Sequence, residues 1–285
     1  MATNHPELLA AYFTISGDVY PFQDNEISPF RFEHRVEAAA RAGYKGIGLV
    51  HPDLMVTKDR LGYAEMNRIM ANHGIKYVEF EFLGDWYKTG DARRRSDTMR
   101  RELFEAADAL NARAVKVAPG LNEREAEADV PRMIDCFGEL AVEAAGYNTA
   151  LTLEIMPFSN VRSVGMAKQI VEGAAQRNGG LLIDIWHLAR AGIEYSEISQ
   201  IDPMYICGVE LDDADRYPVE PLWMDTIHRR RLPGEGVLDI PAFIDAVRAT
   251  GFDGPWGVEI LSESHRKLPL DEMAQRSFDA SAAQF

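Results

Sequence analysis

The chain has 285 residues, of which 30 are basic and 45 acidic, so its formal net charge is −15. This excess of acids argues against a nucleic-acid partner, because phosphate binding relies on a basic patch. Hydrophobic residues make up 46% and charged residues 26% of the chain, as in an ordinary globular protein. No apolar run approaches the ~20 residues that span a bilayer. The start, MATNHPELLA, lacks the pattern of a signal peptide. We therefore expect a cytoplasmic protein with no membrane or nucleic-acid partner.

The two cysteines, Cys136 and Cys207, both stand in apolar surroundings. Such cysteines are typical of buried free thiols in a reducing compartment. Neither has neighbours that indicate a nucleophile or a metal ligand.

Short apolar runs alternate with amphipathic stretches along the whole chain. We expect strands at 10–16, 45–50, 76–82, 112–118, 150–156, 180–185, 204–211 and 254–260. Helical periodicity is clearest at 32–42, 98–110, 130–145 and 240–249. A glycine or asparagine stands at several expected helix ends, among them Gly43 and Asn111.

Eight such alternations in a chain of this length predict a single (β/α)₈ TIM barrel. No linker or change of composition divides the sequence, so we expect one domain over residues 1–285. An open doubly wound sheet is the alternative, but no G-x-G-x-x-G follows the first expected strand. The longest loop, at about 212–238, follows the seventh expected strand, and loops on that face carry function in this architecture.

Four acids interrupt the apolar pattern near the carboxyl ends of the fifth to eighth expected strands: Glu154, Asp184, Glu210 and Glu259. An arginine partner or a capping role explains any one of them. Four at equivalent depth on neighbouring strands would repel one another unless a cation lay between them. The pattern therefore predicts a divalent metal ion. All-oxygen ligation favours Mn²⁺ or Mg²⁺, with Co²⁺ or Zn²⁺ as alternatives.

Further polar residues are candidates for substrate binding at the same end of the barrel: His187, Lys116, Arg230, His51 and Glu81. His187 follows the sixth expected strand, where a functional role is favoured over a structural one. Lys116 interrupts the fourth expected strand; it either points inward as a base or substrate anchor, or points outward with its charged end in solvent. Arg230 either closes the long loop over a ligand or belongs to a solvated arginine run. His51 and Glu81 are placed on the second and third expected strands.

Three segments carry a resemblance to a known family: LTLEIMP, LLIDIWHLARAG and PGEGVLDIPAFIDAVRATGFDGPWGVEI. In these segments and their order the chain resembles the xylose isomerase-like TIM-barrel superfamily, which includes sugar phosphate isomerases, epimerases and inosose dehydratases. The resemblance covers nearly the whole chain. The PGEG segment is a marker of the family and a poor marker of the reaction.

The resemblance implies that Glu154, Asp184, Glu210 and Glu259 hold the metal ion. Glu210 stands where the family pattern usually has a histidine, which leaves the metal and the substrate open. By the same resemblance, Glu154 and Glu259 also exchange the substrate's proton. This role is chemically reasonable, because a metal that bridges a carbonyl and a neighbouring hydroxyl acidifies the C–H bond between them and stabilises the resulting enediolate.

The predicted function is a metal-dependent isomerase or epimerase of a small sugar or polyol-like ketone. The alternative is a dehydratase of a keto-cyclitol, which shares proton abstraction and then expels a hydroxyl group. A repair endonuclease is disfavoured by the negative charge and by the small number of histidines, and a non-catalytic sugar-binding barrel is the last alternative. A homo-oligomer is compatible with the sequence, which does not determine the oligomeric state.

Overall fold

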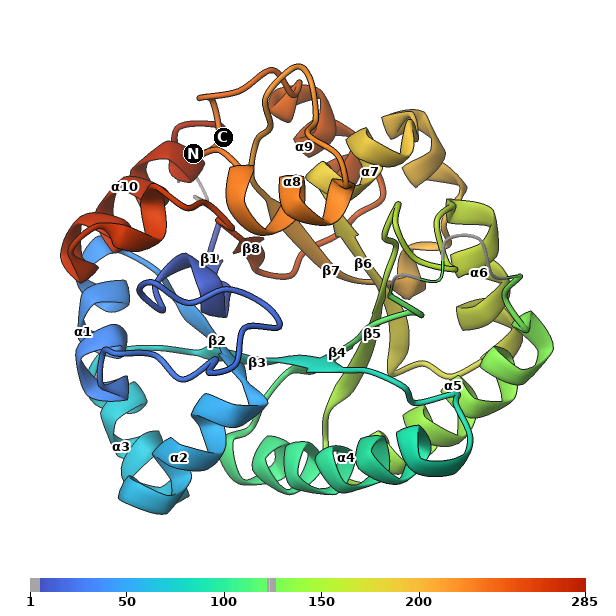
Figure 1. Ribbon diagram of the computed structural model, residues 1–285, viewed down its shortest axis with the longest axis horizontal. Helices are drawn as coiled ribbons and strands as arrows, with labels where there is room; N and C mark the ends of the chain where they lie inside the picture. Colours follow the sequence, from blue (N-terminus) through green and yellow to red (C-terminus); the bar gives the residue numbers. More distant parts are fainter. Residues whose placement is uncertain (1–5, 122, 124–126) are drawn as a thin grey trace. The chain divides into compact units, whose positions relative to one another are not determined.

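The computed structural model describes residues 6–121, 123 and 127–285. Within them, eight parallel strands form a closed barrel in the order of the chain, with helices between successive strands (Figure 1). This confirms the predicted (β/α)₈ architecture. The strands are β1 (Leu8–Ala10), β2 (Gly46–Val50), β3 (Tyr77–Leu83), β4 (Ala114–Val117), β5 (Ala150–Glu154), β6 (Gly179–Asp184), β7 (Ile206–Leu211) and β8 (Trp256–Val258).

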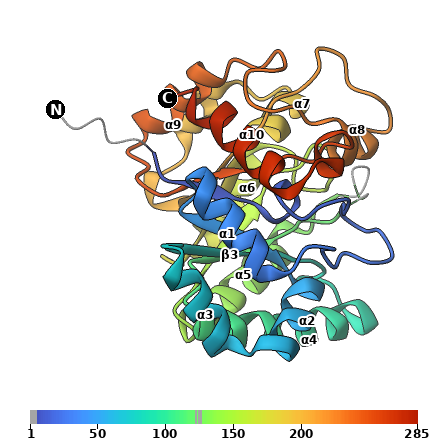
Figure 2. The same cartoon turned by 90° about the vertical axis from the view of Figure 1, so that its left-hand side faces the viewer.

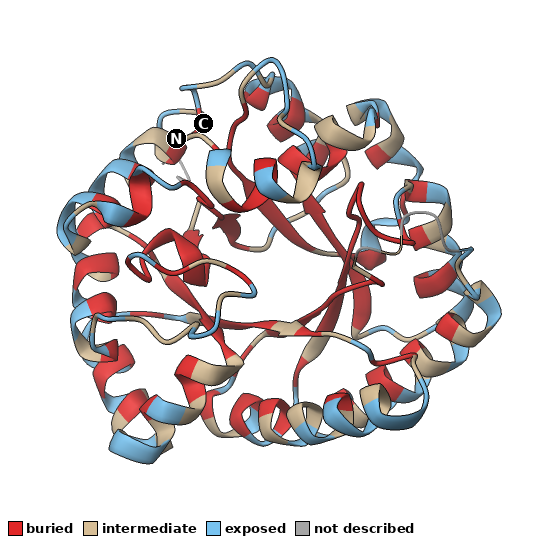
Figure 3. Ribbon diagram, viewed as in Figure 1, coloured by how far each residue is buried: buried red, intermediate tan, exposed pale blue. Residues whose placement is uncertain are grey.

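Helices separate the strands and cover them. The α-helices are α1 (Phe32–Ala42), α2 (His51–Leu61), α3 (Tyr63–Asn72), α4 (Gly90–Leu110), α5 (Val130–Ala145), α6 (Val164–Ala174), α7 (Ile185–Ala191), α8 (Leu222–Arg229), α9 (Ile240–Ala249) and α10 (Leu270–Ala282). Short 3₁₀ helices are η1 (Tyr12–Thr14), η2 (Tyr195–Gln200), η3 (Pro203–Tyr205) and η4 (His265–Lys267). In Figure 3 the strands are almost wholly buried, whereas the helices alternate buried and exposed residues. Strands buried on both faces need continuous apolar runs, as the sequence has.

The chain forms two compact units. The first unit comprises Met1–Val78, Glu210–Ile244 and Gly254–Phe285. In it, β1 pairs in parallel with β2 and with β8. Helix α1 packs against α10, and both face the viewer in Figure 2. The buried Tyr44 hydroxyl donates a hydrogen bond to the hydroxyl of Ser277 in α10 at 2.9 Å.

The second unit comprises Glu79–Val209 and Asp245–Asp253. Its strands β3 to β6 pair in parallel in chain order, and α5 packs against α6. Helix α5 begins where the Asp129 carboxylate accepts the Arg132 backbone N–H, and α6 begins where Ser163 accepts that of Met166. These side chains satisfy backbone donors at the helix start. The expectation of one domain over the whole chain stays a prediction.

The turn that contains Pro233-Gly-Glu-Gly is folded around the carboxylate of Asp213, in the first unit. Asp213 accepts backbone N–H groups from Gly234, Gly236 and Leu238, at 2.9 to 3.0 Å, and also from Ala214 at 2.8 Å. A Cβ added at Gly236 would lie 2.3 Å from the Asp213 carboxylate. Glycine is needed there because the backbone approaches the acid too closely for any side chain.

Several expected boundaries were wrong. The first strand ends at Ala10 and is followed by η1, whereas we expected a strand over 10–16. The helix expected at 98–110 begins already at Gly90, and the loop expected at 212–238 contains α8. Cys136 and Cys207 are free thiols as expected, but both are half-buried rather than buried. The described residues include no helix with the length and apolar character needed to cross a membrane.

Candidate active site

Two buried carboxylates end neighbouring strands of the second unit. Glu154 is the last residue of β5, and Asp184 is the last residue of β6. In the parallel register Glu154 lies opposite Leu182, so Asp184 stands two residues further along the adjacent strand. Residues two apart point to the same face of a sheet. The strand ends therefore bring both acids to one face, and both are buried.

His187 joins these two acids. Helix α7 begins directly after β6, and the Asp184 carboxylate accepts the backbone N–H of His187 at 3.0 Å. The imidazole Nε2 of His187 then lies 3.0 Å from Oε1 of Glu154. Ligand atoms of Glu154, Asp184 and His187 all lie within 4.8 Å of one another. Two carboxylates and an imidazole are donors that divalent ions accept, so this buried group fits a metal ion by its chemistry.

The other two predicted ligands, in the first unit, lie on β7 and directly after β8. Glu210 of β7 is in register with Gly257 of β8, and Glu259 follows the end of β8. The backbone N–H of Glu259 donates to the Leu211 carbonyl at 3.1 Å. Both carboxylates are buried. Thus each unit holds two of the four predicted acids at the carboxyl ends of paired strands.

Arg230 is the basic partner of Glu259. It is only 1% exposed, and its Nη1 lies 3.1 Å from Oε2 of Glu259 while also forming an ion pair with Asp212. Nε and Nη2 donate to the Thr226 hydroxyl at 3.2 and 3.0 Å. The interpretation of Arg230 as part of a solvated run was therefore wrong: the loop buries a permanent cation against two acids. A contact between Arg230 and substrate stays a prediction.

The remaining candidates separate into a pair and a single residue. Lys116 and Glu81 form a buried ion pair at 3.3 Å between β4 and β3 in the second unit. The Lys116 side chain is therefore not directed to solvent. His51 is half-buried and begins helix α2, one residue after the strand on which it was placed. Roles for all three in substrate binding stay predictions.

Two contacts of the candidate site escaped the sequence reasoning. Asp212, the buried partner of Arg230, was not singled out, although a second acid so soon after Glu210 was a usable signal. Thr226 had no signal, because its contact with Arg230 depends on the helical turn of α8. His187 was placed with the substrate, and its geometry also makes it a candidate metal ligand.

Comparison with known proteins agrees with this architecture. Residues 36–282 match the family model described as xylose isomerase-like TIM barrel. An inosose isomerase from Halalkalibacterium halodurans is 26% identical over 183 residues, which are 63% of this chain and 64% of that protein. A 3-dehydroshikimate dehydratase from Pseudomonas aeruginosa is 25% identical over 238 residues, 82% of this chain and 37% of that protein. The chain thus spans less than two thirds of the length of either relative.

Solved structures show the same fold. The crystal structure of the IOLI protein with a bound zinc atom superposes with a TM-score of 0.85, at 20% identity, over 98% of this chain and 97% of that one. At this identity, the likeness concerns the fold alone.

Proposed function

The chain belongs to the xylose isomerase-like TIM barrel family, and we propose that it is a metal-dependent isomerase or epimerase of a small polyhydroxylated ketone. One observation carries the proposal: two buried strand-end glutamates each have a basic partner, His187 for Glu154 and Arg230 for Glu259. Proton transfer next to a carbonyl needs such positioned carboxylates. Inosose isomerases among the relatives support an isomerase of a cyclic keto-polyol.

We propose that Glu154, Asp184, Glu210 and Glu259 hold one divalent ion, with His187 as an alternative ligand. In a (β/α)₈ barrel the functional residues come from the carboxyl ends of the strands, which is where all four acids stand. Oxygen donors favour Mn²⁺ or Mg²⁺, and participation of the imidazole would favour Zn²⁺ or Co²⁺. Such an ion, when bound, would polarise the substrate carbonyl and neutralise the charge that develops on its oxygen.

The two glutamates take different roles in this proposal because their partners differ. Arg230 is always cationic, so it keeps Glu259 paired as a carboxylate ready to accept the proton on the substrate carbon. The imidazole of His187 can carry a proton, so it can resupply Glu154 after Glu154 returns one to the substrate. The proton leaves carbon for a Glu259 oxygen, and the electron pair of the C–H bond forms the enediolate. Glu154 then delivers a proton to the opposite face of the same carbon in an epimerase, or to the former carbonyl carbon in an isomerase. In the isomerase the remaining hydroxyl proton of the enediolate passes to the former carbonyl oxygen, and a new carbonyl forms at the deprotonated carbon.

The alternative function is a dehydratase, supported by the 3-dehydroshikimate dehydratases among the relatives. It shares the first proton transfer and differs in the second, where a hydroxyl group leaves as water. The Glu154–His187 pair would then protonate the leaving hydroxyl rather than carbon. We prefer the isomerase because the match to the inosose isomerase spans 64% of that protein, whereas the match to the dehydratase spans only 37% of that one.

Turnover of a panel of keto-sugars and keto-cyclitols in D₂O, read by mass spectrometry, tests the proposal. An isomerase or epimerase yields a product with the substrate's composition that carries solvent deuterium on carbon. A product lighter by one water would establish the dehydratase instead. No turnover and no hydrogen exchange with any ketone, in protein loaded with Mn²⁺, Mg²⁺ or Zn²⁺, would contradict both.

Two variants separate the roles of the glutamates. Glu259→Gln should lose both turnover and exchange of the substrate's carbon-bound hydrogen with solvent. Glu154→Gln should lose turnover but keep part of the exchange, because Glu259 still removes the first proton. Glu263→Gln changes an exposed glutamate near Glu259 in sequence and serves as the control, with activity expected to match the parent. Equal exchange in Glu259→Gln and the parent would remove Glu259 from the mechanism.

A further inference from the structure

The strand that leads to Glu259 loses its neighbour on one edge before it reaches this residue. Strand β1 pairs in parallel with β8, and Ala11, directly after β1, donates its N–H to the Val258 carbonyl at 3.0 Å. In a parallel ladder the next bond would run from the Ile260 N–H to the Ala11 carbonyl. That carbonyl instead accepts the Thr14 N–H at 3.1 Å, because the chain has turned into η1. Ile260 is buried, so its N–H needs another acceptor.

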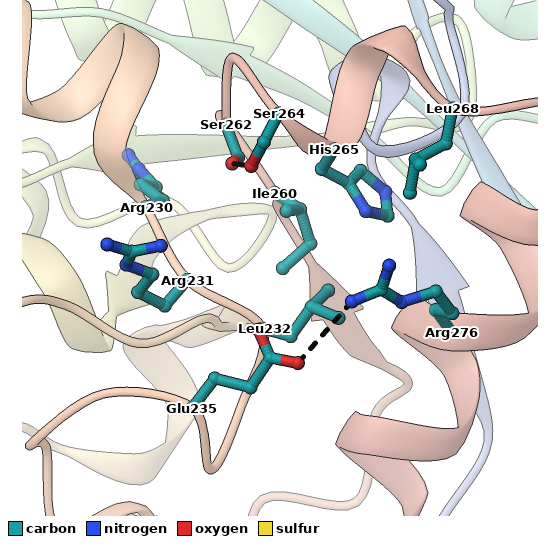
Figure 4. Close-up of a pocket in the computed structure, with 10 residues that line it drawn as sticks. All are labelled: Arg230, Arg231, Leu232, Glu235, Ile260, Ser262, Ser264, His265, Leu268 and Arg276. Carbon is teal, nitrogen blue, oxygen red and sulfur yellow. Dashed lines mark hydrogen bonds and ion pairs between the residues drawn. The ribbon is translucent and has the colours of Figure 1, made fainter.

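The hydroxyl of Thr14 takes the place of the missing strand. Its Oγ1 donates to the Val258 carbonyl at 2.6 Å and accepts the Ile260 N–H at 2.9 Å. A hydroxyl group can do both at once, so one oxygen satisfies the two backbone groups on either side of Glu259. Thr14 is 0% exposed, and its carbonyl is hydrogen-bonded to Nε2 of His265 at 3.0 Å. Figure 4 shows His265 and Ile260 together on the part of the chain that follows β8.

The backbone of Glu259 is thereby held from both edges of its strand. On the edge toward β7, its own N–H donates to the Leu211 carbonyl at 3.1 Å. On the edge toward β1, the residues directly before and after it are bound to Thr14. Its carboxylate reaches Arg230, with 3.1 Å between Oε2 and Nη1. Since β8 itself ends one residue earlier, the backbone that carries this carboxylate depends on Thr14 and Leu211 for its position.

We propose that Thr14 is a positioning residue for Glu259. The inference rests on the proposed function, in which Glu259 removes the proton from the substrate carbon. Thr14 acts through Glu259 rather than on the substrate, because the one hydrogen of its hydroxyl is donated to the Val258 carbonyl. A carboxylate base must lie within hydrogen-bond reach of the proton that it accepts. Such a group has to be held to within about 0.5 Å of its productive position.

The variant Thr14→Val keeps the shape of the side chain and puts a methyl group where the hydroxyl was. A methyl carbon approaches an oxygen no closer than about 3.3 Å. Oγ1 of Thr14, in contrast, lies 2.6 Å from the Val258 carbonyl oxygen and 2.9 Å from the Ile260 nitrogen. The segment after β8 must therefore retreat, and the Ile260 N–H loses its acceptor. Thr14→Ser retains the hydroxyl and avoids both effects.

Turnover kinetics at saturating Mn²⁺, with the ketone that the panel identifies, test the proposal together with solvent exchange of the substrate's carbon-bound hydrogen. Thr14→Val should lower kcat and the exchange rate at least about tenfold, since a misplacement of 1 Å can cost about 100-fold. KM should stay within about twofold of the parent, because the change moves the proton acceptor, and Thr14→Ser should recover kcat. Thr57→Val is the matched control, because Thr57 is also a buried threonine of the first unit, in α2; it should match the parent.

Two measurements without substrate keep this inference separate from the proposed reaction. The amide proton resonance of Ile260, assigned by its absence in Ile260→Val, should move upfield in Thr14→Val, as for an amide that loses its acceptor. It should stay near the parent position in Thr14→Ser. Crystal structures of the parent and of Thr14→Val should show a longer contact between Arg230 and Glu259 in the variant. Thr14→Ala also removes the hydroxyl and should cause the same changes, should Thr14→Val fail to fold.

Other results would overturn the proposal. An unchanged Ile260 resonance in Thr14→Val would show that the hydroxyl is not the acceptor of this amide. A shifted resonance with parent-like kcat, or with an unchanged contact between Arg230 and Glu259, would show that Thr14 holds the backbone without positioning the carboxylate. Equal loss of kcat in Thr14→Ser would assign the effect to packing rather than to the hydroxyl. If the parent turns over no ketone, the proposed function fails alone, and the resonance and the contact decide the role of Thr14.

Discussion

Acidification should destabilise the fold through His265. Burial lowers the pKa of this residue from 6.5 to about 4, the Thr14 carbonyl opposes the shift, and the nearby Arg276 adds to it. The unfolded chain therefore takes up a proton near pH 6.5 and the folded chain only near pH 4, so stability falls as the pH falls through this window. With these two pKa values, the loss is about 2 kcal/mol between pH 7 and pH 5 and about 3 kcal/mol in full.

Urea unfolding at pH 7 and pH 5 measures this effect, with His265→Gln as the comparison because glutamine does not titrate. Carboxylates such as Glu33, whose pKa Arg60 lowers to about 2, contribute equally to both proteins and cancel in the difference. The parent should lose about 2 kcal/mol more than the variant on acidification. If both lose the same free energy of unfolding, His265 titrates normally in the folded state and the reasoning from its burial is refuted.

Two further predictions concern the strand-end acids. Arg230→Met should lower the free energy of unfolding by about 3–5 kcal/mol because Asp212 and Glu259 lose their buried cation. Adding Asp212→Asn should recover part of this loss. Thermal and urea unfolding measure both effects, and a loss below about 1 kcal/mol would contradict the pairing. Glu210→Ala should weaken Mn²⁺ binding at least tenfold in calorimetry while Glu210→His largely preserves it; parent-like affinity in both variants would remove Glu210 from the ligand set.

The sequence predicted the barrel because burial on both faces demands short apolar runs, and those runs are local. The predicted end of the first strand was wrong for the same reason. The run over 10–16 stays apolar after the strand ends, since Tyr12 and Phe13 pack in a buried cluster with Val19 and Leu261. Strand and 3₁₀ helix both bury these side chains. Apolar composition alone therefore could not locate the end of β1.

The start of α4 was missed because its first turns face solvent. Ion pairs such as Arg94–Asp91 and Arg93–Asp97 occupy this stretch instead of an apolar stripe. Hydrophobic periodicity detects a helix only where one side is buried. The helix was therefore predicted from Thr98, where the apolar positions begin.

The acids of the site could be predicted because a carboxylate inside an apolar strand is conspicuous. Their basic partners are harder to predict. Arg230 reaches Asp212 across 18 positions of loop and helix, and nothing in the run Arg229-Arg230-Arg231 marks the middle residue as buried. Its two neighbours pair with Asp215 near the surface. Only the path of the chain distinguishes them.

The Asp213 turn has a consequence for how this chain is classified. Its carboxylate supplies, from within the chain, the anion around which the backbone N–H groups of Gly234, Gly236 and Leu238 gather. The turn is thus complete without any ligand, and none of these contacts involves a reacting group. The Pro-Gly-Glu-Gly stretch therefore marks the turn that closes the loop after β7. The same turn can therefore close this loop whatever substrate the chain acts on.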